Sequence, residues 1–304
     1  KAGIDVKIED VKRVTVIGAG TMGRQIAMNT ALNGRKEGYQ VVLTDSFEKA
    51  VDSAKAWAAD YLKGRVSKGR ITQEEADLVS SCLAFTTDVD TGVMGADLVV
   101  EAIIENLEIK KELFGRISKI VKADTILATN SSNLVSSKLA EVTEHPERLM
   151  NLHYFNPALV MQLVEVVKGP HTSDEAVECA RAFGERTGKS PIVIQKEIAG
   201  FVANRINAAV TREACLLLEK GIASVEDIDT ACEKGLGYPM GPFKLMDMTG
   251  LDVNYYVRRD RFAESGDPND APSLLVIDKV IKGEFGRKTG KGWYDYSQKG
   301  NKED

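Results

Sequence analysis

The sequence contains few residues of the kinds that cross-link chains or bind metal ions. Its 304 residues include only four cysteines and three histidines. The cysteines stand singly, with neither CxxC spacing nor a histidine pair nearby, at Cys82, Cys179, Cys215 and Cys232. Zinc sites and disulfide frameworks need such residues in closely spaced sets. We therefore expect reduced, structural thiols and no metal.

Long apolar runs and an excess of positive charge are also missing. No run approaches the roughly 20 apolar residues that cross a bilayer, and residues 1–10 lack the apolar core and cleavage site of a signal peptide. The formal charge of −5 argues against the broad basic face with which proteins bind nucleic acid. These absences predict a cytoplasmic protein that has no membrane or nucleic-acid partner.

What the sequence does contain, up to about residue 195, is an alternation of β-branched runs with amphipathic stretches. This pattern is typical of a parallel sheet covered on both faces. The predicted strands are Val11–Ile17, Gln40–Thr44, Leu98–Ala102, Thr125–Thr129, Leu149–Phe155, Met161–Val167 and Pro191–Gln195. The predicted helices between them are Thr21–Leu32, Phe47–Lys68, Ile109–Lys122 and Ser173–Thr187.

After Ile198 the pattern indicates helices only. These are predicted over Phe201–Lys220, Ser224–Lys234, Lys244–Glu264 and Leu274–Lys282. We therefore expect an α/β protein with a Rossmann-type dinucleotide-binding domain over residues 1–196, followed by a smaller all-helical domain over 197–304. The length of the chain suits two domains better than one.

A glycine-rich loop follows the first predicted strand and opens a helix. It reads Gly18, Ala19, Gly20, Thr21, Met22, Gly23. In that setting the first glycine permits a tight turn, the second lets the backbone approach a pyrophosphate, and the third lets the helix pack on the strand. The alternative is a glycine-rich turn without a ligand, but the position after a strand favours a dinucleotide site.

The next strand ends at Asp45, whose carboxylate can accept hydrogen bonds from ribose hydroxyls and repels a 2′-phosphate. NAD is therefore expected rather than NADP. Arg35 and Lys36 could have favoured NADP, but they lie in a loop that enters the strand at its other end, whereas ligands bind at the carboxyl ends of strands.

A candidate general base stands at the end of a later strand. His153 and Glu165 are opposite each other if their two strands form a hairpin about residues 157–160. Imidazole can take a proton from an alcohol near neutral pH, and a paired carboxylate orients the ring and raises its basicity. A structural histidine is the alternative, and we assign His145 and His171 to that class.

Small polar residues follow the strand that ends at Thr129, in the run Asn130-Ser131-Ser132-Asn133. At the carboxyl end of a strand they can bind a nicotinamide ribose and a substrate oxygen. A Ser/His/Asp hydrolase would use such a serine differently, but no GxSxG elbow is present. A serine-rich turn that caps a helix is the other alternative.

Taken together, these residues resemble the short-chain L-3-hydroxyacyl-CoA dehydrogenases, and the resemblance runs nearly end to end. Besides the glycine loop, the segments that carry it are Val100–Leu107, Thr129–Ser132, His153–Pro157, Val164–Val166, Gly200–Arg205, Gly237–Pro242 and Lys291–Tyr294. Two departures from the family pattern are an insertion over Gly34–Gly38 and Asn133 where many relatives have serine.

The resemblance implies roles for individual residues. It makes His153 the base and Glu165 its partner, and it assigns Ser132 and Asn204 to the substrate oxygen. It implies that Glu105, Lys110, Ser132 and Asn156 contact the cofactor, and that Lys68 and Tyr61 contact the CoA of the substrate. It also implies NAD-dependent, reversible oxidation of an L-3-hydroxyacyl-CoA, with a short acyl chain as in 3-hydroxybutyryl-CoA.

Two other functions stay open at this point. One is a dehydrogenase of a free hydroxy acid or sugar acid on the same fold, and the other is a non-catalytic NAD-binding protein. The stretch Ala208–Leu218 has few polar breaks, which predicts a buried subunit contact and hence a homodimer.

Overall fold

The computed structural model describes residues 6–297, which form two compact units divided between Phe201 and Val202. The first unit is built on an eight-stranded sheet with the order β3-β2-β1-β4-β5-β6-β7-β8. Its strands are β1 (Arg13–Ile17), β2 (Gln40–Thr44), β3 (Leu83–Thr86), β4 (Leu98–Glu101), β5 (Ile126–Thr129), β6 (Leu149–Tyr154), β7 (Leu163–Val167) and β8 (Ser190–Ile194).

Neighbouring strands are parallel throughout the sheet except for β6 and β7, which are antiparallel. All seven strands predicted from the sequence are present. The edge strand β3 was not predicted.

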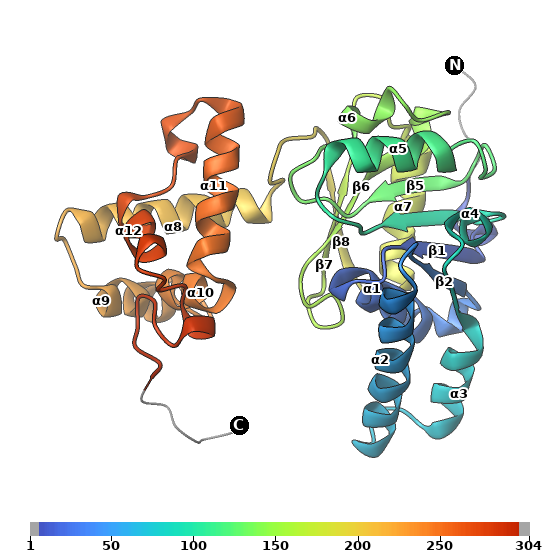
Figure 1. Ribbon diagram of the computed structural model, residues 1–304, viewed down its shortest axis with the longest axis horizontal. Coiled ribbons are helices and arrows are strands. Elements are labelled where there is room, and N and C mark those ends of the chain that lie inside the picture. Colours follow the sequence, from blue (N-terminus) through green and yellow to red (C-terminus); the bar gives the residue numbers. More distant parts are fainter. Residues whose placement is uncertain (1–5, 298–304) are drawn as a thin grey trace. The chain divides into compact units, whose positions relative to one another are not determined.

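Helices cover both faces of this sheet (Figure 1). On one face, buried side chains come from α1 (Thr21–Asn33), α2 (Glu48–Ser67), α3 (Gln73–Cys82) and α7 (Asp174–Arg186). On the other they come from α4 (Val89–Val93), α5 (Leu107–Ile117) and α6 (Ser137–Ala140). A sheet buried on both faces explains why its strands are nearly continuous runs of valine, isoleucine and leucine.

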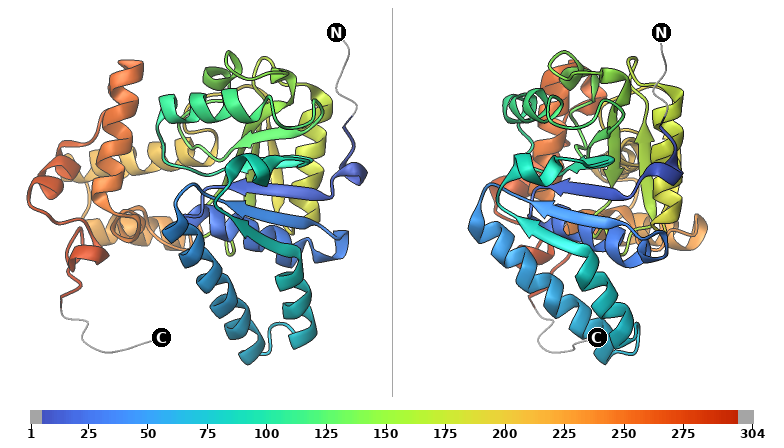
Figure 2. Two further views of the ribbon diagram at one scale, coloured as in Figure 1. Left: turned by 45° about the vertical axis from the view of Figure 1, so that its right-hand side comes forward. Right: turned by 90° about the vertical axis from the view of Figure 1, so that its right-hand side faces the viewer.

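Helices α2 and α3 lie side by side and extend beyond the sheet (Figure 2). No helix was predicted from the sequence over α3. The turn between the two helices is followed by a complete capping box, in which Thr72 and Glu75 each bond the backbone N–H of the other. This motif starts α3.

The second unit is helical. It contains α8 (Ala203–Glu219), α9 (Val225–Thr230), α10 (Pro242–Thr249), α11 (Leu251–Ser265) and α12 (Leu274–Ile281), with a π-helical turn over Ala231–Gly235. The α/β fold with a helical second part is therefore confirmed. The prediction of a single helix over Lys244–Glu264 is wrong, because Gly250 has a φ of +102° and ends α10 before α11 begins.

No helix among residues 6–297 is long and apolar enough to span a membrane.

Candidate active site

The glycine loop after β1 is built so that two of its glycines cannot be replaced without displacing backbone. A Cβ on Gly18, whose φ is +107°, would lie 2.4 Å from the carbonyl oxygen of Ala102, and a Cβ on Gly23 would lie 1.7 Å from that of Gly18. Gly20 differs, because a Cβ there meets nothing within 4 Å. The loop is therefore packed closely on β4 and α1 but leaves space beside Gly20.

That space suits a pyrophosphate. Gly20 is the residue before α1 and has no side chain with which to cap the helix, so the first N–H groups of α1 and its positive end can meet an anion. Asp45 stands beside the loop and accepts hydrogen bonds from the backbone N–H of Ala19 at 2.8 Å and of Phe47 at 2.9 Å. These residues fit a dinucleotide, with the loop at the phosphates and Asp45 at a ribose.

Arg35, in the insertion, is engaged away from the glycine loop. Arg35 forms an ion pair with Glu75 of α3 at 2.7 Å and donates to the carbonyl of Leu32. Gly38 turns the chain with a φ of +72° just before β2. The insertion thus lies at the amino end of β2, away from Asp45, as expected from the sequence.

The imidazole of His153 is held by two polar side chains. His153 on β6 and Glu165 on β7 are directly opposite in the antiparallel register, and Nδ1 of His153 lies 2.8 Å from Oε2 of Glu165. Nε2 lies 2.9 Å from Oγ of Ser132. Since an ionised carboxylate can only accept, Nδ1 donates to Glu165, and in the neutral imidazole Nε2 then presents a lone pair toward Ser132. This hairpin register is the one predicted from the sequence.

The side chain of His153 is buried, and so is that of its partner Glu165. His153 is 3% exposed and Glu165 is 0% exposed. By contrast, His145 is exposed, and burial lowers the pKa of His171, with Glu197 opposing that effect. His171 bonds the carbonyl of Leu149 at 3.2 Å, which is the structural role expected for it.

The hairpin turn that joins β6 to β7 is fixed by a buried lysine. Nζ of Lys189 donates to the carbonyl of Ala158 and, at 2.8 Å, to that of Met161. Burial lowers the pKa of Lys189. Asn156 begins this turn with an exposed side chain and a cis bond to Pro157.

The Ser132 loop is fixed by two asparagines. Asn130 accepts the backbone N–H of Tyr154 at 2.8 Å. Asn151 on β6 donates to the carbonyls of Ser131 at 3.3 Å and Leu134 at 2.9 Å. The loop is therefore bound to the strand that carries His153, which holds the Ser132 hydroxyl at the imidazole.

Beside this loop lies a buried charge network that sequence reasoning missed. Glu101, at the end of β4, is 0% exposed. Its carboxylate accepts hydrogen bonds from Nζ of Lys110 at 2.5 Å, from the backbone N–H of Ile103 at 2.7 Å and from the hydroxyl of Thr129 at 2.7 Å. The signal in the sequence was a glutamate at the end of an apolar strand, but its partners come from three other segments.

Glu105 connects this network to the Ser132 loop. Its side chain is 41% exposed and lies 3.5 Å from Nζ of Lys110. It also accepts the hydroxyl of Ser131 and, at 3.3 Å, the backbone N–H of Asn133. A serine at position 133 would donate that same backbone bond, so this departure from the family pattern leaves the contact intact. Lys110 itself is only 1% exposed, so its ammonium faces carboxylates rather than solvent.

The remaining predicted residues lie on helices α2 and α8. Tyr61 is on α2, where its ring stacks on Trp57 with centroids 5.3 Å apart. Lys68 is exposed at the carboxyl end of the same helix. Asn204 is in the first turn of α8, in the helical unit.

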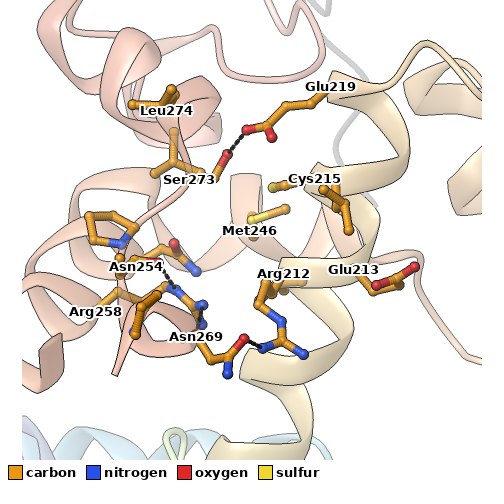
Figure 3. Close-up of a pocket in the computed structure, with 16 residues that line it drawn as sticks. Arg212, Glu213, Cys215, Glu219, Met246, Asn254, Arg258, Asn269, Ser273 and Leu274 are labelled. Atoms are coloured by element: carbon orange, nitrogen blue, oxygen red, sulfur yellow. Dashed lines mark hydrogen bonds between the residues drawn. The ribbon is translucent and has the colours of Figure 1, made fainter. Parts of the chain in front are cut away.

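The helical unit has a hollow of its own, about 450 Å³ in volume, which contains none of the predicted site residues (Figure 3). Arg258 at its wall donates to the carbonyls of Ala208, Asn269 and Ala271. Its guanidinium therefore links α8, α11 and the segment after α11. We assign these contacts a structural role.

Comparison with known proteins agrees with this geometry. Residues 13–198 match the family model for the NAD binding domain of 3-hydroxyacyl-CoA dehydrogenase, and residues 200–296 match the model for its C-terminal domain. The chain belongs to the 3-hydroxyacyl-CoA dehydrogenase family. It is therefore an NAD-dependent dehydrogenase. The resemblance seen in the sequence and the expected cofactor are confirmed.

The relatives cover almost the whole chain. This chain is 40% identical over 295 residues to the mitochondrial hydroxyacyl-coenzyme A dehydrogenase of Homo sapiens. The matched residues are 94% of this chain and 91% of the human protein. The chain is 33% identical over 287 residues to a 3-hydroxybutyryl-CoA dehydrogenase of Mycobacterium tuberculosis, with 94% and 99% covered. The crystal structure of (S)-3-hydroxybutyryl-CoA dehydrogenase from Ralstonia eutropha is similar with a TM-score of 0.88 and 36% identity, covering 95% of this chain and 100% of that one.

Proposed function

We propose that this dehydrogenase reversibly oxidises a short-chain L-3-hydroxyacyl-CoA, such as 3-hydroxybutyryl-CoA, to the 3-oxoacyl-CoA. The observation that supports this most is the contact pattern of His153, whose Nδ1 lies 2.8 Å from Glu165 and whose Nε2 lies 2.9 Å from Ser132. The pair stands at the edge of the sheet where the strands that carry the glycine loop and Asp45 also end.

In the proposed reaction NAD supplies the acceptor for the hydride that leaves C3 of the substrate. Nε2 of His153 takes the proton of the 3-hydroxyl, and the Glu165 carboxylate stabilises the imidazolium that forms. Ser132 donates a hydrogen bond to the substrate oxygen, which stabilises negative charge on that oxygen as its proton leaves. Asn204 is proposed as a second donor from the family resemblance.

We propose that Glu105 and Asn156 contact the cofactor directly. Lys110 is buried against Glu101, so we propose that it acts on the cofactor site through its ion pair with Glu105. Among the residues proposed to bind NAD, the loop Gly18–Gly23 would hold the phosphates and Asp45 the adenine ribose.

Recognition of CoA is proposed at the end of α2. Lys68 supplies positive charge for a phosphate and Tyr61 a hydroxyl, and both side chains reach solvent at least in part. The helical unit is proposed to complete substrate binding and to form a homodimer through α8. A cytoplasmic location remains a prediction, since the relatives include proteins named as mitochondrial.

The test follows NADH absorbance after purified protein is mixed with acetoacetyl-CoA, with free acetoacetate in parallel. We expect rapid NADH loss with the thioester, and a loss of activity by roughly 10²–10⁴-fold in His153→Gln, with NADH binding retained. The control is His145→Asn, since asparagine tolerates the left-handed backbone at position 145, where φ is +54°.

Turnover of the free acid alone would favour a hydroxy-acid dehydrogenase. NADH binding without turnover of either compound would favour a non-catalytic role.

A further inference from the structure

The segment that leads from the first unit to the helical unit is fastened to the Ser132 loop. Oε2 of Glu197 accepts the backbone N–H of Ser137 at 3.2 Å. Three residues later the N–H of Gly200 donates to the carbonyl of Ser132 at 3.3 Å. The chain therefore passes directly beside the loop that holds the hydroxyl against the imidazole.

The last residue of this segment, Phe201, packs its ring on His153. The two ring centroids are 5.2 Å apart with an interplanar angle of 58°. Phe155 contacts the same imidazole at 4.6 Å with an angle of 61°. Phe201 is 1% exposed and packs with Val167 and Ile194, so the imidazole is in contact with two aromatic rings as well as with Glu165 and Ser132.

The backbone of Phe201 is strained. Its φ is +50°, and within residues 6–297 only His145 shares a positive φ without being glycine. The preceding Gly200 has a φ of +78°. A bulky residue rarely adopts this conformation, and such outliers persist where surrounding structure enforces them, often at functional sites. Glycine would relieve the strain, but it would remove the ring from the imidazole.

We propose that Phe201 is a positioning residue for His153, an inference that rests on the proposed role of His153 as the base. The bond between Cβ and the ring of a histidine has a broad torsional preference, and rotation about it would carry both nitrogens away from their partners. Aromatic packing on the imidazole opposes this rotation. Phe201 thus keeps Nδ1 on Glu165 and Nε2 on the hydroxyl to be deprotonated, from the point where the chain leaves the first unit.

The kinetic test is Phe201→Leu, which keeps an apolar side chain but removes the ring. We expect kcat to fall by about tenfold, the change that corresponds to one lost aromatic contact of roughly 1.4 kcal/mol, while the Kd for NADH stays within twofold. In Phe201→Gly the kcat should fall by the same factor, although glycine relieves the backbone strain at this position. The matched control is Phe183→Leu, a fully buried phenylalanine that packs on Tyr39, which should lose stability without loss of kcat.

A second measurement does not depend on turnover. The chain has three histidines, so the Cε1–H resonances are few enough to assign by substitution. We expect the His153 resonance to move in Phe201→Leu, because a neighbouring ring current is removed, and to broaden as the ring gains freedom. The same resonance should be unchanged in Phe183→Leu.

A Phe201→Leu protein with wild-type kcat and an unmoved His153 resonance would overturn the proposal, and so would equal kcat losses in both leucine variants. If wild-type protein turns over neither substrate, the proposed function fails, but the width of the His153 resonance still tests whether Phe201 orders the imidazole, since loss of the ring current alone changes only its position. Should Phe201→Leu fail to fold, Phe201→Met carries the same comparison.

Discussion

The carboxylate of Glu101 and the ammonium of Lys110 lie 2.5 Å apart, and the two side chains are 0% and 1% exposed. Each charge is compensated by the other, and Glu101 has two further donors in Ile103 and Thr129. The pair sits between the end of β4 and the start of α5, where it fixes the segment that carries Glu105. Lys110 cannot change alone without leaving the Glu101 carboxylate as an unpaired charge in the interior.

We therefore expect Lys110→Met to lower the free energy of unfolding by about 3–5 kcal/mol, since an unpaired buried charge costs far more than a pair contributes. The double variant Glu101→Gln, Lys110→Met should recover much of that loss. Urea unfolding followed by circular dichroism measures both. A single variant as stable as wild type would contradict the buried ion pair.

Glu165→Gln tests the partner of the imidazole. The amide can donate as well as accept, so it no longer fixes the proton on Nδ1 or stabilises the imidazolium. We expect kcat with acetoacetyl-CoA to fall by roughly 10²–10⁴-fold, with the Kd for NADH little changed. A decrease of less than threefold would mean that the carboxylate does not serve the base.

The glycine loop allows binding to be separated from folding. Because a Cβ at Gly20 meets nothing within 4 Å, Gly20→Ala should fold with near wild-type stability but bind NADH at least tenfold more weakly, by obstructing the phosphates. Gly23→Ala should lose stability as well, since its Cβ would lie 1.7 Å from a carbonyl oxygen. Fluorescence titration with NADH and thermal unfolding distinguish the two. Unchanged NADH affinity in Gly20→Ala would place the cofactor elsewhere.

Two buried thiols make the stability of the protein depend on pH in the alkaline range. Burial raises the pKa of Cys215 from an ordinary 9.0 to about 11 and that of Cys179 to about 12. A group with a raised pKa contributes its stability fully below the unfolded value and loses it as the pH rises toward the folded value. We expect the free energy of unfolding to fall less steeply between pH 9 and 11 in Cys215→Ala than in wild type. Parallel pH curves for the two proteins would count against this.

The same thiols should be inert at pH 8. In the folded protein a disulfide reagent should label Cys82 and Cys232, which are partly exposed, and should reach Cys179 and Cys215 only after unfolding. Peptide mapping of labelled protein, with and without urea, identifies the sites. Labelling of Cys215 in the native protein would show that the helical unit opens readily.

The proposed homodimer predicts a mass of twice 33.2 kDa by light scattering. On α8, Ile206 is 60% exposed and Leu216 is 37% exposed, which leaves apolar surface on this helix that a partner could cover. A single mass of 33.2 kDa at all concentrations would exclude the dimer.

Prediction from sequence succeeded where a local pattern carries the information. The run Gln40–Thr44 is the strand β2 to the residue, because four apolar or β-branched residues, Val41–Thr44, lie between turn residues. The glycine loop and the position of His153 opposite Glu165 also follow from local spacing. These features together give the sheet, the cofactor loop and the imidazole pair.

What was missed depends on contacts between distant segments. Thr72 and Glu75 could have indicated α3, since their spacing is that of a capping box. Strand β3 lies at the sheet edge, and its four residues, Leu83–Thr86, are too few to show a clear period. The importance of Glu101 could not be read, because Lys110 and Thr129 meet it only in the fold. The strain at Phe201 likewise has no signal in a sequence.

The antiparallel arrangement of β6 and β7 makes the pair of His153 and Glu165 depend on how the two strands are aligned. Side chains alternate between the faces of a strand, so a slip of β7 by one residue against β6 would turn Glu165 to the opposite face and leave the imidazole without its carboxylate. Lys189 donates to the carbonyls of Ala158 and Met161 in the turn between the two strands. A lysine remote from the imidazole therefore helps to keep the strands in the alignment that the base requires.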